Sequence, residues 1–298
     1  IWLNNVGTAL GGHMKTLKMT LLIAVLSVMI APPVMAINLD KLRDLDKLRE
    51  VKEKLKPLQS TSEQDEITLG KDVAANLLGA APLVNDPALQ AYVNKIGMWI
   101  ALHTDRPGLP WRFGILDTAS VNAFATPGGY VFITRGMLLR MRDESELAGV
   151  LAHEVSHVVE KHALNTMRKG SLVGMASDAL SRNKPEYAKL VSAGTEIFAR
   201  GLDKQDEFAA DRMGVVLAAR AGYDPYGLPA VLQTLSSINP KDDAVSLMFK
   251  THPDSEKRLE LVSNSMEGRL DQYVNQPKVE SRFSSVIKTH IAKYKPSK

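Results

Sequence analysis

The segment 147–160, which reads LAGVLAHEVSHVVE, constrains this chain more than any other stretch. Its apolar residues recur every three or four positions, which is typical of an α-helix. Side chains four residues apart lie one above the other on a helix, so His153 and His157 present two imidazoles to one point. Glu154 lies beside them, turned too far away to be a third ligand of the same ion. This H-E-x-x-H pattern predicts a helix that offers two nitrogen ligands to zinc and a carboxylate that takes a proton from water.

A catalytic zinc site has three protein ligands and leaves one position open, so a third ligand must come from elsewhere in the chain. A third histidine in the spacing H-x-x-G-x-x-H is excluded, because positions 160 and 163 hold Glu and Ala and His162 falls one residue short. Of the acidic residues downstream, Glu207 and Asp211 form the one pair of carboxylates a turn apart on a strongly helical run. We predict that Glu207 is the third ligand and that Asp211 accepts the outer ring N–H of a ligating histidine.

Small residues share the helix face that carries this acidic pair, at Ala210, Gly214 and Ala218. Small side chains let another helix approach closely, which metal–oxygen bonds of about 2.0–2.2 Å require. Two structural alternatives remain: Glu207 as a solvated charge on a helix face, and a core helix whose histidines merely lie on its polar edge.

Together with the segment NAFATPGG at 122–129, these motifs resemble the zinc metallopeptidase family of HtpX, Oma and BepA. The resemblance runs from about residue 62 to about residue 261. It implies a gluzincin endopeptidase that binds one zinc ion per chain through His153, His157 and Glu207. Glu154 would be the general base, and proteins or peptides would be the substrates.

The fold class that we expect is α+β and mainly helical: a zincin-like domain in which a small sheet with an antiparallel edge lies beside two zinc-bearing helices. The expected sheet has three or four strands. Alternating patterns predict three of them, and Pro and Gly between the last two indicate a turn. These strands are at 111–117, 122–126 and 130–134.

The strand that begins with Asn122, Ala123 and Phe124 has a predicted role in substrate binding. By resemblance, it forms the edge of the sheet along the cleft, and a substrate peptide adds to it as a further strand. A purely structural hairpin is the alternative, because alternation alone cannot say which edge is free.

His252 stands in a second informative stretch, which reads THPDSEKR at 251–258. By resemblance, His252 lies at the zinc, where it either stabilises the oxyanion on the scissile carbonyl or coordinates the metal in a resting, self-inhibited state. Arg258, about one turn later, is a candidate for orienting it. An ordinary surface histidine is the alternative.

The N-terminal region reads as a targeting segment. Residues 1–13 precede Met14 without a recognisable pattern, and we interpret them as lying upstream of the natural start. Residues 14–36 combine Lys15 and Lys18 with a short apolar core and small residues before a cleavage site, which predicts a secretory signal peptide. An uncleaved membrane anchor is the alternative. We expect an exported, periplasmic protein, and not a lipoprotein, because the chain has no cysteine.

The remaining organisation follows from charge and periodicity. Residues 37–58 are predicted to form an amphipathic helix that packs on its own domain or pairs with a partner. Residues 59–270 are predicted to form the metallopeptidase domain, and residues 271–298 a basic helix and tail. The segment 170–201 is either a lid or an ordinary connection.

The charge balance bears on partners and on function class. The net charge of +4 falls to +2 without residues 1–36, which argues against a nucleic-acid partner. A peripheral membrane contact or an envelope partner stays open, and so does the oligomeric state. The rival function is a binding or chaperone-like protein whose zinc is structural or blocked by His252. Glu154 favours the enzyme, because a structural zinc has no use for it.

Overall fold

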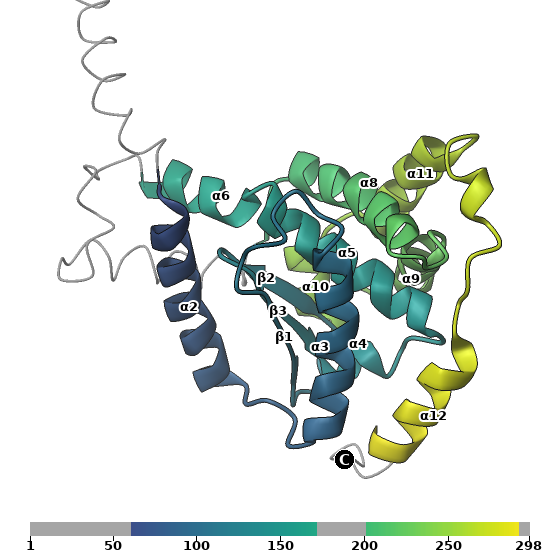
Figure 1. The fold of residues 1–298 in the computed structure, drawn as a ribbon, viewed down its shortest axis with the longest axis horizontal. Coiled ribbons are helices and arrows are strands. Elements are labelled where there is room, and N and C mark those ends of the chain that lie inside the picture. The colour runs from purple at the N-terminus through teal and green to yellow at the C-terminus, as the bar shows by residue number, and fades with distance from the viewer. Residues whose placement is uncertain (1–60, 172–200, 292–298) are drawn as a thin grey trace, which may run out of the picture. The chain divides into compact units, whose positions relative to one another are not determined.

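The computed structural model describes residues 61–171 and 201–291, which belong to the unit Glu53–Lys298 (Figure 1). The predicted signal peptide at 14–36, the predicted helix at 37–58 and most of the segment 170–201 lie outside the described residues. The elements follow in this order: α2 (Glu63–Ala80), α3 (Pro87–Ala101), β1 (Arg112–Leu116), β2 (Ala123–Thr126), β3 (Tyr130–Thr134), α4 (Arg135–Leu138), α5 (Glu144–Val159), α6 (His162–Ser171), α8 (Lys204–Arg220), α9 (Gly227–Ser236), α10 (Asp243–Thr251), α11 (Ser255–Met266), the short 3₁₀ turn η2 (Asp271–Tyr273) and α12 (Glu280–Ile291).

The three described strands form one mixed sheet in the order β1-β3-β2. β1 runs parallel to β3, and β2 runs antiparallel to it with Phe124 opposite Phe132. The hairpin predicted between β2 and β3 is therefore confirmed. Gly128 and Gly129 have φ angles of 75° and 100°, which glycine adopts without strain. The buried carboxylate of Glu66 on α2 accepts the backbone N–H of Gly128 and so holds this turn.

α5, the helix that carries the H-E-x-x-H pattern, is the centre of the domain. It packs against α3, α8, α9, β2 and β3, and its residues are buried from Glu144 to Val158. Asp143 caps it, because its side chain accepts the backbone N–H of Glu146 at 3.0 Å. A helix buried on all sides holds its polar side chains in fixed positions, and this makes α5 a suitable base for a site.

Close approach of α8 and α9 to α5 depends on glycines at the contacts. A Cβ atom at Gly214 of α8 would lie 3.0 Å from the backbone nitrogen of His153, and one at Gly149 of α5 would lie 2.6 Å from that of Leu228. Ala210 and Ala218 are fully buried beside Gly214. The close helix approach predicted from the small residues of α8 is thus confirmed.

The C-terminal segment, expected to be separate from residue 271 onward, packs on the same domain. Phe283 of α12 is buried in the main core, and Arg282 pairs with Glu144 at the start of α5. The carbonyl oxygen of Lys278 accepts the first two backbone N–H groups of α5, from Glu144 and Ser145. The domain therefore continues beyond residue 270, because this segment caps the helix that carries the site.

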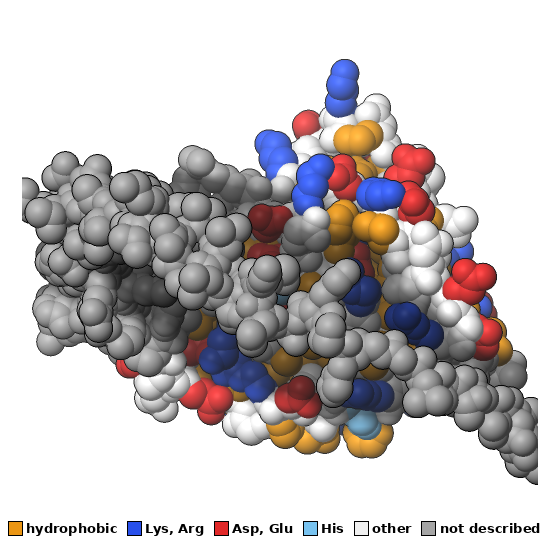
Figure 2. Space-filling view, turned by 90° about the horizontal axis from the view of Figure 1, so that it is seen from above, with side chains coloured by type: hydrophobic (Ala, Val, Ile, Leu, Met, Phe, Trp, Pro, Cys, Tyr) orange, Lys and Arg blue, Asp and Glu red, His pale blue; other side chains and the backbone are white. Residues whose placement is uncertain are grey.

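The predicted fold class is confirmed: helices predominate around one small sheet. On the face seen in Figure 2, basic and acidic side chains are interspersed among hydrophobic ones. Within the described ranges, no helix combines the length and the apolar composition needed to cross a membrane.

Candidate active site

The two histidines of α5 face one another inside the protein. Their Nε2 atoms lie 3.0 Å apart, and each residue is 3% exposed. The cause is local, because residues four apart on a helix project from the same side. Glu154 is also buried, and it lies on the side of α5 that faces β2 and His252.

Glu207 comes from the first turn of α8, where the close approach at Gly214 brings the helix against α5. Its Oε1 atom lies 3.4 Å from Nε2 of His157, and its Oε2 atom lies 3.6 Å from Nε2 of His153. Oε1 is buried and finds no hydrogen-bond partner among the described residues. An unsatisfied buried carboxylate oxygen is costly, so its position beside two ring nitrogens needs an explanation.

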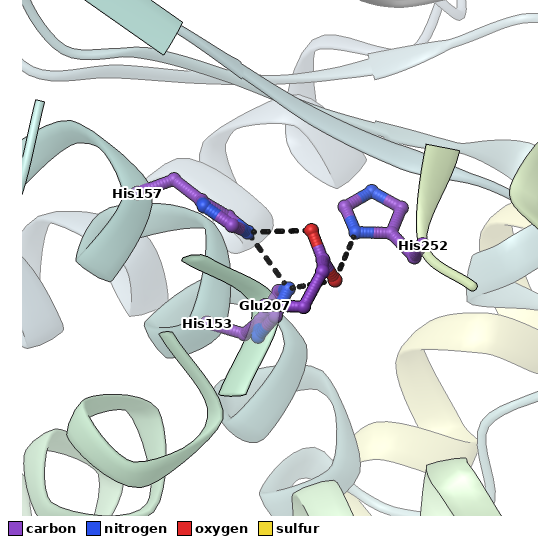
Figure 3. A group of neighbouring side chains, drawn as sticks. All are labelled: His153, His157, Glu207 and His252. Atoms are coloured by element: carbon purple, nitrogen blue, oxygen red, sulfur yellow. Dashed lines mark hydrogen bonds and ion pairs between the residues drawn. The ribbon is translucent and has the colours of Figure 1, made fainter. Parts of the chain in front are cut away.

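His252 completes the cluster from the loop that ends α10. Its Nδ1 atom lies 2.9 Å from Oε2 of Glu207, and its Nε2 atom lies 3.3 Å from the carbonyl oxygen of Ala123. Figure 3 shows His153, His157, Glu207 and His252 turned toward one another from three separate elements. The ligand atoms of these four residues all lie within 4.8 Å of one another.

This arrangement fits a metal ion. Two ring nitrogens in contact and a carboxylate oxygen without a donor are a poor set of hydrogen bonds, but they are a suitable set of ligands. Two His nitrogens with one carboxylate oxygen form a ligand set found at catalytic zinc sites.

Asp211 lies behind His153, at the position expected from the sequence. Its Oδ1 atom is 2.9 Å from Nδ1 of His153. Arg258, the candidate for orienting His252, has its guanidinium on both carboxylate oxygens of Asp211, at 2.7 and 2.8 Å, and on Oε2 of Glu207 at 3.1 Å. Arg258 thus contacts Glu207, the carboxylate that also binds Nδ1 of His252, and its Nη2 atom lies 3.4 Å from Nε2 of His153. The reason is that α11 packs against α8, and this brings a buried arginine to the two buried acids of that helix.

His162 is a neighbour of the site that sequence reasoning missed. Its Nδ1 atom lies 2.9 Å from Nδ1 of His157, and its Nε2 atom lies 3.7 Å from a carboxylate oxygen of Asp206. Its spacing in the sequence excluded it as a ligand and gave no sign of another role. The chain turns sharply at Lys161, where φ is 59°, and this turn brings His162 back against α5. Only that backbone geometry reveals the contact.

The charges of the cluster are strongly perturbed. Although burial and the charge of Arg258 lower it, the carboxylates of Asp211 and Glu207 raise the pKa of His153 to about 9. Burial lowers the pKa of His157 to about 3. Burial also raises the pKa of Glu154, with His252 and His153 acting in the opposite direction. Such shifts concentrate at functional sites.

The predicted substrate strand lies at the edge of the sheet, beside this cluster. Ala123 and Phe124 line a cavity with Glu154 and His252. Asn122 is fully buried, and its side chain contacts Thr251 and the backbone N–H of Ala123. Asn122 therefore links the start of β2 to Thr251, the residue before His252. Its side chain supports this part of the site.

Comparisons with known proteins agree with this geometry. Peptidase family M48 matches residues 87–265. The beta-barrel assembly-enhancing protease of Escherichia coli (strain K12) is 32% identical over 205 residues, which are 65% of this chain and 42% of that protein. The mitochondrial metalloendopeptidase OMA1 of Arabidopsis thaliana is 31% identical over 170 residues, 56% of this chain and 34% of that protein. The metalloprotease YcaL of Escherichia coli (strain K12) is 30% identical over 165 residues, 53% of this chain and 63% of that protein.

The chain thus spans 42% of the length of the beta-barrel assembly-enhancing protease. The family match covers more than half of the chain and includes α5, α8 and the loop with His252. Both the matched residues and the His-His-Glu-His cluster lead to one conclusion: the chain belongs to peptidase family M48, a family of metallopeptidases.

Proposed function

We propose that this protein is an exported, zinc-dependent endopeptidase that cleaves misfolded or envelope proteins. The observation that carries the proposal is the convergence of His153, His157 and Glu207 beside the buried carboxylate of Glu154. A binding protein would have no use for Glu154 in this place, whereas hydrolysis of a peptide bond needs a base there.

His153, His157 and Glu207 would hold the zinc ion. When bound, zinc lowers the pKa of a water molecule and polarises a peptide carbonyl. Glu154 takes the proton from the attacking water and later delivers it to the leaving amine. Glu154 is buried beside this cluster, so its carboxylate is held close to the position where the attacking water would lie.

Two further groups prepare the site. The carboxylate of Asp211 contacts the outer ring nitrogen of His153 and thereby fixes the orientation of this ring as a ligand. The guanidinium of Arg258 neutralises the buried charge of Asp211. His252 binds Glu207 in the same place and is proposed to close the ligand set in the resting protein. It must move away before substrate and water enter, because catalysis requires an open position.

Substrate class and location form the second half of the proposal. A peptide would add to the outer edge of β2 in the described sheet, where the carbonyl oxygen of Ala123 faces His252. The name of the Escherichia coli relative, a beta-barrel assembly-enhancing protease, supports an envelope role. Residues 14–36 would be removed on export, which N-terminal sequencing of the exported protein tests: a start at Ile37 is expected, and a retained segment would indicate an anchor.

The decisive experiment measures zinc content and casein cleavage of the purified protein, with and without a chelator. We expect about one zinc ion per chain and cleavage that the chelator abolishes. A protein that holds zinc and binds unfolded chains but never cleaves them would instead be the chaperone-like protein considered above.

A further inference from the structure

Glu66 of α2 is a fully buried carboxylate that lies outside the metal cluster. Its two oxygens accept N–H groups of Arg106, each at 2.9 Å, and Nζ of Lys161 lies 3.4 Å from one of them. The other oxygen also accepts the backbone N–H of Gly128 at 3.2 Å. A buried charge is costly unless several donors meet it, and these contacts meet that of Glu66. We call Glu66, Arg106 and Lys161 the Glu66 clamp, because they join α2 to the loop after α3 and to the end of α5.

The Glu66 clamp acts on the last turn of α5. Arg106 donates from Nη1 to the carbonyl oxygen of Val158 at 3.2 Å, and Val158 directly follows His157. The same carbonyl oxygen accepts the backbone N–H of Lys161 at 3.1 Å. Lys161 itself has a φ of 59°, a strained conformation for a residue other than glycine, so surrounding contacts must hold it. Its ion pair with Glu66 and the hydrogen bond of Arg106 to Val158 supply such contacts.

We propose that Glu66 is a positioning residue of the metal site, which fixes the chain reversal after α5 and thereby keeps His162 on the outer nitrogen of His157. His162 is the first residue after the strained Lys161, and its Nδ1 atom lies 2.9 Å from Nδ1 of His157. A partner on the outer nitrogen sets the tautomer and the orientation of a ligating histidine. The proposal rests on the proposed metallopeptidase function and adds a residue of α2 to its site.

Glu63, one turn before Glu66 on α2, provides a natural comparison. It also pairs with Arg106, at 3.2 Å, but its side chain is 61% exposed. Water screens an exposed ion pair, so its loss changes little, whereas removal of a buried charge leaves its buried partners uncompensated. Loss of the charge of Glu66 should therefore release the turn at Lys161, and loss of the charge of Glu63 should not.

The affinity test is a double-mutant cycle in the full chain, with zinc as the probe and a chelating dye as the competitor. Glu66→Gln should weaken zinc binding roughly tenfold, because it frees the partner of His157, and Glu63→Gln should leave the affinity unchanged. Because Glu66 acts through His162, the double variant Glu66→Gln/His162→Ala should bind zinc about as tightly as His162→Ala alone. Losses that multiply, or equal affinities of Glu66→Gln and Glu63→Gln, overturn the proposal.

Hydrogen exchange without added zinc tests the turn directly. The backbone N–H groups of Lys161 and Asn165 donate to the carbonyl oxygens of Val158 and Lys161, so their exchange reports opening of the turn. Mass spectrometry should show exchange in residues 160–165 roughly several-fold faster in Glu66→Gln than in Glu63→Gln, with residues 144–150 at the start of α5 unchanged. Unchanged exchange in the turn, or equally faster exchange along all of α5, contradicts a positioning role.

Arg106→Lys tests the clamp with its charge retained, and it replaces Glu66→Gln if that variant does not fold. Lysine lacks the planar fork that holds both oxygens of Glu66 and the carbonyl of Val158, so it should speed exchange in residues 160–165 in the same way. Wild-type exchange in this variant counts against the clamp. A wild-type protein that binds no zinc would contradict the peptidase proposal alone, and the exchange result would then decide on the clamp.

Discussion

Glu144 and Glu207 are both fully buried carboxylates against α5, and they differ in what satisfies them. At the start of α5, both oxygens of Glu144 accept hydrogen bonds: from the hydroxyls of Tyr92 and Tyr223, at 2.6 and 3.0 Å, and from the guanidinium of Arg282. Both carboxylate oxygens of Glu144 therefore have hydrogen-bond donors within the protein.

Glu207, at the other cluster, is only half satisfied. Its Oε2 atom binds His252 and Arg258, but its Oε1 atom has no hydrogen-bond partner among the described residues and lies against His157. A buried polar group without a partner costs about 1–3 kcal/mol. The Glu144 cluster therefore holds the fold together, whereas the Glu207 cluster is arranged for a group that the chain does not supply.

The largest effect should come from the residue beside the incomplete cluster. Glu154→Gln removes the base and leaves the ligands intact, so cleavage of casein should fall roughly 10²–10⁴-fold. Zinc content by atomic emission should stay at the wild-type level, as should the midpoint of urea unfolding. Full activity in this variant would mean that another group moves the proton.

A matched pair of substitutions tests the comparison itself. Glu207→Gln should lose most of the bound zinc, because it removes a ligand. Glu144→Gln should keep the zinc and lower the free energy of unfolding by about 1–3 kcal/mol, because buried hydroxyls and a guanidinium lose a charged acceptor. Zinc titration and urea denaturation of the metal-free proteins measure both effects. If instead Glu144→Gln loses the zinc and Glu207→Gln only lowers the free energy of unfolding, the Glu144 cluster is the metal site and the Glu207 cluster is structural.

His162 sharpens the comparison at the metal cluster. His162→Ala removes the neighbour of the outer nitrogen of His157 and should weaken zinc binding roughly 10–100-fold, as loss of such a partner typically does. His290→Ala is the control, since His290 contacts Asp86, the N-cap residue of α3, rather than a site residue. Competition with a chelating dye measures the affinity. Equal affinities in the two variants would reduce His162 to a packing residue.

His252 offers a smaller test of how the half-satisfied carboxylate is held. If His252 closes the ligand set, His252→Ala should raise basal casein cleavage, roughly several-fold, and admit chelator faster, because the open position is populated more often. Lower cleavage with unchanged zinc exchange would instead assign His252 to oxyanion stabilisation.

The smallest expected effect concerns the pH dependence of the satisfied cluster. Burial alone would raise the pKa of Glu144, but hydrogen bonds from Arg282, Tyr92 and Tyr223 outweigh it and hold that pKa below its ordinary value. Its contribution to stability is therefore present above the unfolded pKa of about 4.3 and is lost as the pH falls through the folded pKa. The stability difference between wild type and Glu144→Gln should stay constant at neutral pH and shrink below about pH 4. The control Glu260→Gln breaks an exposed pair with Lys257 and should change stability little at any pH.

The parts of the site that lie on one helix could be predicted from local sequence patterns. His153, Glu154 and His157 are placed by helical spacing alone, and the turn at Gly128 and Gly129 follows from residues that tolerate positive φ. The small residues on one face of α8 also indicate which carboxylate approaches α5. Local patterns succeed here because the relevant distances are set within a few residues of backbone.

The other contacts of the site could not be predicted in this way, because they join elements far apart in the chain. Packing of α11 against α8 directs Arg258 to Asp211 and Glu207 instead of His252. The turn at Lys161 places His162 behind His157, and the strand order puts β2 at one edge of the described sheet. The C-terminal segment, predicted as a basic helix and tail, caps α5 through Lys278 and Arg282. No local pattern encodes such partners, because each depends on how whole helices and strands pack together.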